Sequence, residues 1–247
     1  MRKVPLLVFL LISIVSFSQD KNAIVIYKKD MSNYAINSKK PERKEAISSM
    51  LNDLKSSSNS LRYSLIINDY KSVFSLEENL AIEANEKSLR FIKVAGDSGG
   101  SFYMNSKSRE LIRSKNLYGE TFNIISSLDS IKWELTNERK KIGNFECYKA
   151  KTIKVVKNSK GIFNHIVEAW YAPEIPFSFG PVGYGGLPGL IIEIQYQNIR
   201  FYVSTIELNN KKNTKIVKPT KGKEVTKNEY NKITKKMAND FLKSIKN

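Results

Sequence analysis

The sequence has almost none of the residues from which metal, redox and charge-relay sites are built. It contains one cysteine and one histidine among 247 residues. A single cysteine excludes an intramolecular disulfide, and one of each supplies too few ligands for a tetrahedral N/S zinc site. A phosphate-binding G-x-x-x-x-G-K-[ST] loop and a G-x-S-x-G nucleophile elbow are also missing. We therefore expect no metal, no cofactor and no catalytic residues of these classes.

Long apolar runs are missing too, except at the N-terminus. Residues 4–15 are apolar, Arg2 and Lys3 precede them, and Ser16-Phe17-Ser18 follows. This pattern is typical of a secretory signal peptide, and we expect cleavage after Ser18. The run is shorter than the roughly 20 residues that cross a bilayer. The sequence thus predicts a signal peptide at 1–18 and a single exported domain at 19–247, in the periplasm, associated with the outer membrane, or extracellular.

Acidic residues are the scarcer charge. Lysine and arginine number 41 against 24 aspartates and glutamates, a formal net charge of +17. Basic surfaces attract nucleic acids, anionic lipids or acidic glycans. Export argues against nucleic acid, and the lysines are dispersed as on a solvated surface. A lipid, a glycan or an envelope protein remain possible partners, and the sequence names none of them.

The two rare residues have structural interpretations. Cys147 lies in the strand-like run 145–150, which indicates a buried thiol rather than a reactive one. His165 also lies on a strand-like run, where a lone histidine is more often structural or exposed than catalytic.

Short apolar or alternating segments punctuated by turn residues dominate the chain and predict an antiparallel sheet. The expected strands are 23–27, 61–67, 72–76, 90–95, 101–105, 111–113, 121–126, 132–136, 145–156, 163–171, 190–196 and 200–208. Helical spacing predicts one helix after Pro41, with apolar positions from Ala46 to Leu54. A second is expected at about 226–246, where Thr226 and Glu229 form a capping box. Its apolar stripe favours packing against the sheet over lying on an anionic membrane.

The segment from Trp170 to Ile191 is rich in aromatic residues, proline and glycine. Leu187-Pro188-Gly189-Leu190 is typical of a type II turn. Such a loop either lines a ligand groove or covers the end of a sheet, and covering is the favoured interpretation. The candidate ligand-binding residues are Trp170, Tyr171, Phe177, Phe179, Tyr184, Gly186, Leu187, Pro188 and Gly189.

The same segment resembles a known family. Residues 186–191 spell GLPGLI, the signature of the GLPGLI family of exported Bacteroidota proteins. Trp133-Glu134-Leu135, residues 141–150 and residues 169–176 resemble the blocks that precede the signature, with Phe145 where the family usually has Tyr. The family is mostly of unknown function. It is similar to the bowl-like N-terminal domain of some bacterial peptide-N-glycosidases and to the open half-barrel of periplasmic lipoprotein carriers. The resemblance implies an α+β, mainly β fold with a curved antiparallel sheet, and it transfers no catalytic residues.

Three functions follow as hypotheses. The first is a non-enzymatic binding or assembly module for an apolar or amphipathic ligand held on the concave face. The second is a protein- or glycan-interaction module that accompanies a secreted glycosidase. The third, and least favoured, is a hydrolase that uses two of the carboxylates Glu168, Glu174 and Glu193.

Overall fold

The structure is a computed structural model of the chain. It describes residues 22–33, 52, 55–56, 58, 61–77, 98–158, 161–210 and 215–244. The expected signal peptide and the expected strand at 90–95 lie outside these residues. The expected helix near residues 41–54 also lies outside them, except for Asn52, which is helical.

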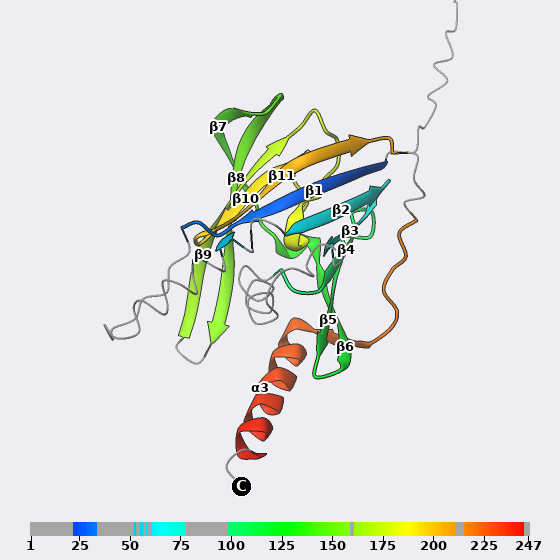
Figure 1. The fold of residues 1–247 in the computed structure, drawn as a ribbon, viewed down its shortest axis with the longest axis vertical. Helices are drawn as coiled ribbons and strands as arrows, with labels where there is room; N and C mark the ends of the chain where they lie inside the picture. Colours follow the sequence, from blue (N-terminus) through cyan, green and yellow to red (C-terminus); the bar gives the residue numbers. More distant parts are fainter. Residues whose placement is uncertain are drawn as a thin grey trace, which may run out of the picture.

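The described residues contain one twelve-stranded sheet, in the order β12-β6-β5-β4-β3-β2-β1-β11-β10-β9-β8-β7 (Figure 1). Its strands are β1 (Asn22–Asp30), β2 (Arg62–Asn68), β3 (Lys71–Leu76), β4 (Ser101–Asn105), β5 (Glu110–Leu117), β6 (Glu120–Ser127), β7 (Glu134–Ile142), β8 (Phe145–Asn158), β9 (Gly161–Ala172), β10 (Leu190–Tyr196), β11 (Ile199–Leu208) and β12 (Lys223–Thr226). The sheet is curved and open, and its edge strands do not close into a barrel. The predicted fold class is therefore confirmed. One pair departs from the antiparallel pattern, because β12 pairs with β6 in parallel.

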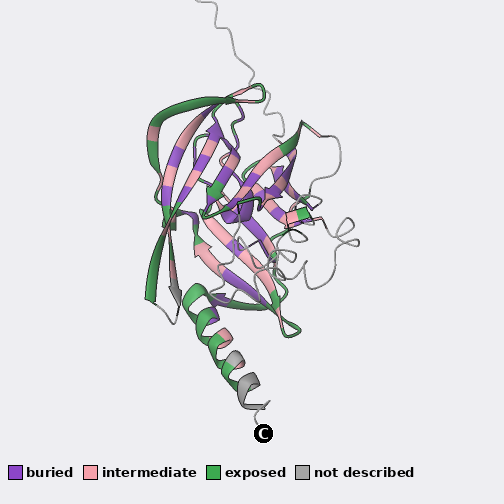
Figure 2. Ribbon diagram, turned by 60° about the vertical axis from the view of Figure 1, so that its left-hand side comes forward, coloured by how far each residue is buried: buried purple, intermediate pink, exposed green. Residues whose placement is uncertain are grey.

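Alternating side chains give the sheet one face that packs the core. In β2 and β3 every second residue is buried, as expected for strands with one covered face. Phe74 lies at the centre of this face, and its ring contacts those of Tyr27, Tyr63, Phe102 and Phe201 at centroid distances of 5.6–6.2 Å. We call this side of the sheet the core face, and Figure 2 shows the buried residues that lie along it.

The C-terminal helix α3 (Lys227–Ser244) begins at the predicted capping box. The Glu229 amide donates to Thr226 Oγ1 at 3.2 Å, and the Thr226 amide donates to Glu229 Oε2 at 2.7 Å. Tyr230 packs edge-on against Phe122 at 5.6 Å. Beyond this first turn the helix extends away from the sheet (Figure 1). The predicted packing therefore holds for the start of the helix.

None of the described helices is long and apolar enough to span a bilayer.

Candidate binding site

The signature segment between β9 and β10 folds onto the core face. Its chain is held by backbone bonds, including Gly186 N to Ser178 O at 2.9 Å and Ile191 N to Phe179 O at 3.0 Å. Within it, the short 3-10 turn η5 (Pro181–Gly183) contacts β3 and β4. The segment thus covers the sheet, which is the interpretation that the sequence favoured.

The predicted turn at residues 187–190 is of a different kind. A type II turn would bond the Leu190 amide to the Leu187 carbonyl. Instead the Gly189 amide bonds Leu187 O at 2.9 Å, and the Leu190 amide bonds Ile175 O at 3.0 Å. The type II assignment was wrong because Leu190 is already the first residue of β10 and its amide is used by the incoming chain.

The candidate ligand-binding residues separate into two groups. Five are buried: Tyr171, Phe177, Phe179, Leu187 and Gly189. Four remain accessible: Trp170, Tyr184, Gly186 and Pro188. Of the aromatic residues, therefore, Trp170 and Tyr184 are the ones that a ligand can reach without rearrangement of the core.

Tyr184 is part of a small surface cluster with Trp133. The two rings are 6.0 Å apart, and Trp133 Nε1 donates to the Gly185 carbonyl at 2.9 Å. Trp133 was not predicted as a site residue, although it belongs to the first block of the family resemblance. Trp133 directly precedes β7, so its hydrogen bond links the start of β7 to the signature segment and holds that segment.

Trp170 points to the face of β9 opposite that of the buried Ala169 and Tyr171, and its partly buried side chain also packs against the core cluster. Pairing across β9 places Lys149 of β8 on one side of it and Glu193 of β10 on the other. Lys140 Nζ lies 4.3 Å from the centroid of the indole ring, and Lys149 Nζ lies 5.6 Å from it. Cations at these distances are attracted by the ring's negative face.

Ion pairs connect the charged residues around Trp170 into two chains. Glu193 accepts from Lys140 at 3.0 Å and from Arg200 at 3.4 Å, and Arg200 also bonds Asp30 at 3.0 Å. On the other side, Lys149 bonds Glu168 at 3.0 Å and Glu138 at 3.1 Å. The hydrogen bond to Glu168 raises the pKa of Lys149 above its ordinary value. Charges of both signs are therefore held in fixed positions around one aromatic ring.

A polar hollow adjoins Trp170 at the β7–β8 hairpin. It has a volume of about 560 Å³ and is lined by Arg139, Lys140, Lys141, Asn144, Glu146 and Glu174. Lys140 borders both the hollow and the indole ring. We define Trp170 together with this hollow as the Trp170 site.

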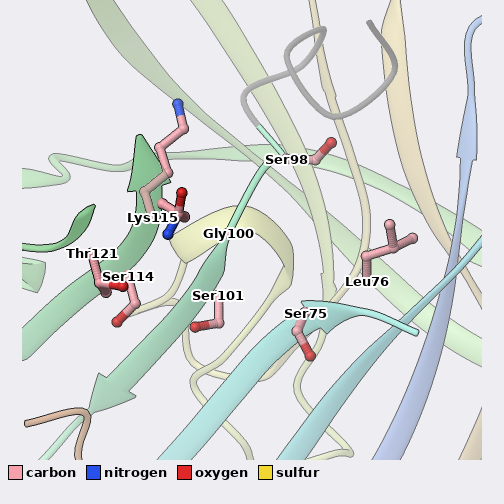
Figure 3. A pocket seen from close by; sticks show the side chains of 9 residues that line it. Ser75, Leu76, Ser98, Gly100, Ser101, Ser114, Lys115 and Thr121 are labelled. Carbon is pink, nitrogen blue, oxygen red and sulfur yellow. The ribbon is translucent and has the colours of Figure 1, made fainter. Parts of the chain in front are cut away.

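A second hollow, of about 320 Å³, lies at the other end of the sheet, between β3, β4, β5 and the start of β6 (Figure 3). Hydroxyl groups from Ser75, Ser101, Ser114 and Thr121 lie around it. At its inner wall Ser98 accepts a hydrogen bond from the buried Lys29 at 3.1 Å. No candidate residue from the sequence analysis borders this hollow.

The three carboxylates considered for hydrolysis all have partners. Glu168 and Glu193 lie on neighbouring strands on the Trp170 side, and each is held by two cations. Glu174 Oε1 instead accepts the Glu146 backbone amide at 3.0 Å. The described residues contain no group of three or more metal-ligating side chains.

Cys147 is buried, as predicted. Burial raises the pKa of its thiol to about 11. At neutral pH it is protonated and is not a nucleophile.

Residues 162–193, which include the GLPGLI signature and Trp170, match the family described as "Protein of unknown function (Porph_ging)". The GLPGLI-type resemblance is confirmed. The match covers the β9 strand, the signature segment and the start of β10, and does not extend to the upstream blocks around Trp133 and residues 141–150. None of the curated proteins matches the chain.

The fold is also similar to that of PNGF-II, a peptide-N-glycosidase. Its C2 crystal form matches with a TM-score of 0.51 and 15% identity, over 86% of this chain and 32% of that one. Its P21 form matches with a TM-score of 0.49 and 14% identity over the same shares. The chain therefore spans about a third of the length of the solved structures that it matches, and the similarity concerns the fold alone.

Proposed function

We propose that this chain is an exported, non-enzymatic binding module that recognises a protein-linked glycan at the Trp170 site, alongside a secreted glycosidase. The observation that carries this proposal is the position of Trp170. Its partly exposed ring lies beside a polar hollow, and both are bordered by Lys140.

The chemistry of the site suits a hydroxyl-rich ligand. An aromatic surface packs against the apolar face of a sugar ring, while fixed charged groups of both signs bind its hydroxyl groups as donors and acceptors. Small-molecule sites commonly combine aromatic surface with a few well-placed polar groups in this way. Lys140, Glu193 and Glu174 supply donors and acceptors within the same region.

An apolar ligand on the core face is less well supported. That function would require open apolar space between the sheet and its cover. In the described part of the chain, Phe177, Phe179 and Leu187 are packed into the core at 6%, 1% and 1% exposure. These side chains occupy the position in which the ligand would lie.

Hydrolysis is less well supported for a different reason. A general acid needs a carboxyl group that stays protonated near neutral pH, which follows from burial or from a neighbouring carboxylate. The charged groups bonded to Glu168 and Glu193 are instead lysine and arginine side chains, and neither carboxylate is bonded to another carboxylate.

The similarity to PNGF-II suggests the ligand for the first test. An N-linked glycopeptide, its deglycosylated peptide and its free glycan are titrated calorimetrically into the wild-type protein and into Trp170→Ala. We expect the glycopeptide and the glycan to bind, and Trp170→Ala to cost about 2 kcal/mol, roughly 30-fold in Kd. Tyr70→Ala is the matched control, because Tyr70 is a 42% exposed aromatic residue on the β2–β3 turn, away from the site.

Three results would contradict the proposal. If the wild-type protein bound none of the three ligands, the proposed function would be wrong. If Trp170→Ala bound as well as the wild type, the proposed site would be wrong. Release of the glycan from the glycopeptide, seen by mass spectrometry and lost in Glu193→Gln, would instead identify an enzyme.

A further inference from the structure

The β8–β9 hairpin extends beyond both of its neighbouring strands. β7 pairs with β8 only as far as Lys151, and β10 pairs with β9 only from Val167. In the described structure, residues 153–158 and 161–166 therefore pair only with each other. They form a two-stranded projection, which we call the ribbon (Figure 1).

One face of the ribbon carries four large exposed apolar side chains, with the exposed Asn164 opposite Val155 among them. The exposed fractions are 61% for Ile153, 52% for Val155, 65% for Ile162 and 64% for Ile166. Ile153 lies directly opposite Ile166, and strand alternation places the other two on the same side. A group of large exposed side chains on one face marks a surface that contacts another apolar phase.

The charge of the ribbon has one sign. Its strands, residues 153–158 and 161–166, contain Lys154 and Lys157 but no aspartate or glutamate, and Lys154 Nζ lies 4.5 Å from the centroid of the Tyr196 ring. The next acidic residue along β9, Glu168, is paired with Lys149 and Lys151. An apolar face with only cationic neighbours is complementary to a surface that is apolar inside and anionic at its border.

Figures 1 and 2 show that helix α3 projects toward the same end of the molecule as the ribbon. It carries five lysines against Glu229 and Asp240. Met237 is partly exposed along it, whereas Ile233 packs against the cluster formed by Phe122, Ile124, Val225 and Tyr230. A second basic, amphipathic element is thus present at this end.

We infer that this end of the protein docks on an anionic lipid bilayer. The apolar face of the ribbon enters the boundary between headgroups and acyl chains, and the lysines of α3 meet the lipid phosphates. Amphipathic elements bind membranes by this combination of buried apolar area and attraction to anionic headgroups, with each nearby lysine adding about 1 kcal/mol.

A second copy of the chain suits this surface less well. Two ribbons packed face to face would bring their lysines together without an acidic partner, and like charges across strands are destabilising. A bilayer presents no such conflict, because its headgroups supply the opposite charge.

The inference is independent of the Trp170 site and compatible with it. Trp170 lies four residues along β9 from Ile166, roughly 13 Å at the rise of a β-strand. The row formed by Lys151 and Glu168 lies between them. A ribbon inserted as far as Ile166 therefore leaves the Trp170 site in water.

The test is co-sedimentation with vesicles of phosphatidylcholine alone and of phosphatidylcholine mixed with phosphatidylglycerol. The complete chain is expressed in each case, so that any processing of its N-terminal segment is the same in all variants. The test variant is Ile153→Ser/Ile166→Ser. The matched control is Leu208→Ser/Val217→Ser, which removes two apolar side chains that are 51% and 67% exposed outside the ribbon.

We expect binding to the anionic vesicles that is much weaker on neutral ones and falls as salt is raised. The ribbon variant should lose about tenfold or more in its partition coefficient, because two apolar side chains no longer leave water. The control should bind like the wild type. Circular dichroism and the urea unfolding curve confirm that each variant is folded.

Other outcomes would overturn the inference. Equal binding by the ribbon variant and the wild type would show that general charge, not the ribbon, attracts the protein to vesicles. A wild-type dimer that becomes monomeric in the ribbon variant, with no vesicle binding, would assign the surface to self-association.

Discussion

At the scale of single residues, the core face contains polar groups that a sheet of this kind usually excludes. Tyr27 and Lys29 of β1 and Tyr63 of β2 are fully buried. Tyr27 donates its hydroxyl hydrogen to the Ile191 carbonyl at 2.6 Å, which joins β1 to the end of the signature segment. The hydroxyl groups of Tyr63 and Ser98 are 3.4 Å apart. Buried groups of this type are stabilising only while they keep their partners.

The two tyrosines predict how stability depends on alkaline pH. Burial raises the pKa of Tyr63 to about 12 and raises that of Tyr27 further. Above pH 10 the unfolded chain loses these protons while the folded protein keeps them, so the folded state is progressively disfavoured as pH rises. Each tyrosine should lower the free energy of unfolding by about 1.4 kcal/mol per pH unit between pH 10 and 12. Urea unfolding across this range measures the slope.

Tyr27→Phe/Tyr63→Phe is the comparison for this slope. All other titratable groups are the same in both proteins, so the difference between the two slopes isolates the tyrosines. Parallel curves for wild type and variant would contradict the prediction.

Some residue-level features were predictable from the sequence and others were not. The capping pair Thr226 and Glu229 follows from a local spacing, and the burial of Cys147 follows from its apolar strand context. The burial of Phe177 and Phe179 does not, because a Pro/Gly-rich loop has no fixed period from which side-chain direction can be read. The position of Lys149 beside Trp170 could have been predicted, because counting along a hairpin with a turn at 158–161 places the two residues opposite each other. The position of Lys140 could not, because the register of β7 shifts between Leu135 and Arg139.

At the scale of elements, the signature segment depends on the conformation of Gly189. Its φ of +156° is one that other residues rarely adopt. A Cβ there would overlap the Ala172 carbonyl oxygen and lie 2.6 Å from the Ala172 carbonyl carbon. Both atoms belong to the backbone at the end of β9, so they cannot turn aside as a flexible side chain would.

Gly189→Ala should therefore destabilise the protein by roughly 2–4 kcal/mol, the sum of backbone strain and overpacking. The urea midpoint gives the measurement. Gly143→Ala is the control: Gly143 also has a positive φ, +58°, but nothing lies within 4 Å of its added Cβ. That change should cost about 1 kcal/mol. Equal losses at both glycines would mean that the close approach of β9 and the signature segment is unimportant.

The sequence predicted most elements because most are hairpins of adjacent strands. Alternating segments predicted β2 and β3 almost to their ends. Between residues 132 and 144 the sequence predicted a strand that ends at residue 136, whereas the structure has a single strand, β7, from Glu134 to Ile142. It missed β12, since Lys223-Glu224-Val225-Thr226 has one buried side chain and therefore no detectable period. A parallel pairing across about 100 residues of chain has no local signal at all.

At the scale of the whole molecule, non-local pairing assembles the sheet. β1 pairs with β2 on one side and with β11 on the other, so segments from both halves of the chain meet in the centre. The main core lies around this junction. A second, smaller cluster of Phe122, Ile124, Val225 and Tyr230 lies at the edge, where α3 and β12 meet β6.

Two separate clusters predict two levels of stability. Phe74→Ala removes the ring at the centre of the main core and should cost about 3–5 kcal/mol of global stability. Tyr230→Ala removes a ring from the edge cluster and should release α3 and β12 while the remaining strands stay folded. Amide hydrogen exchange distinguishes the two cases. Phe74→Ala should accelerate the slowest amides of β1, β2 and β11, whereas Tyr230→Ala should accelerate only those of α3, β12 and β6. If Tyr230→Ala accelerated the central strands as much as Phe74→Ala does, the edge and the core would unfold as one unit, and α3 could not act as a separately anchored projection.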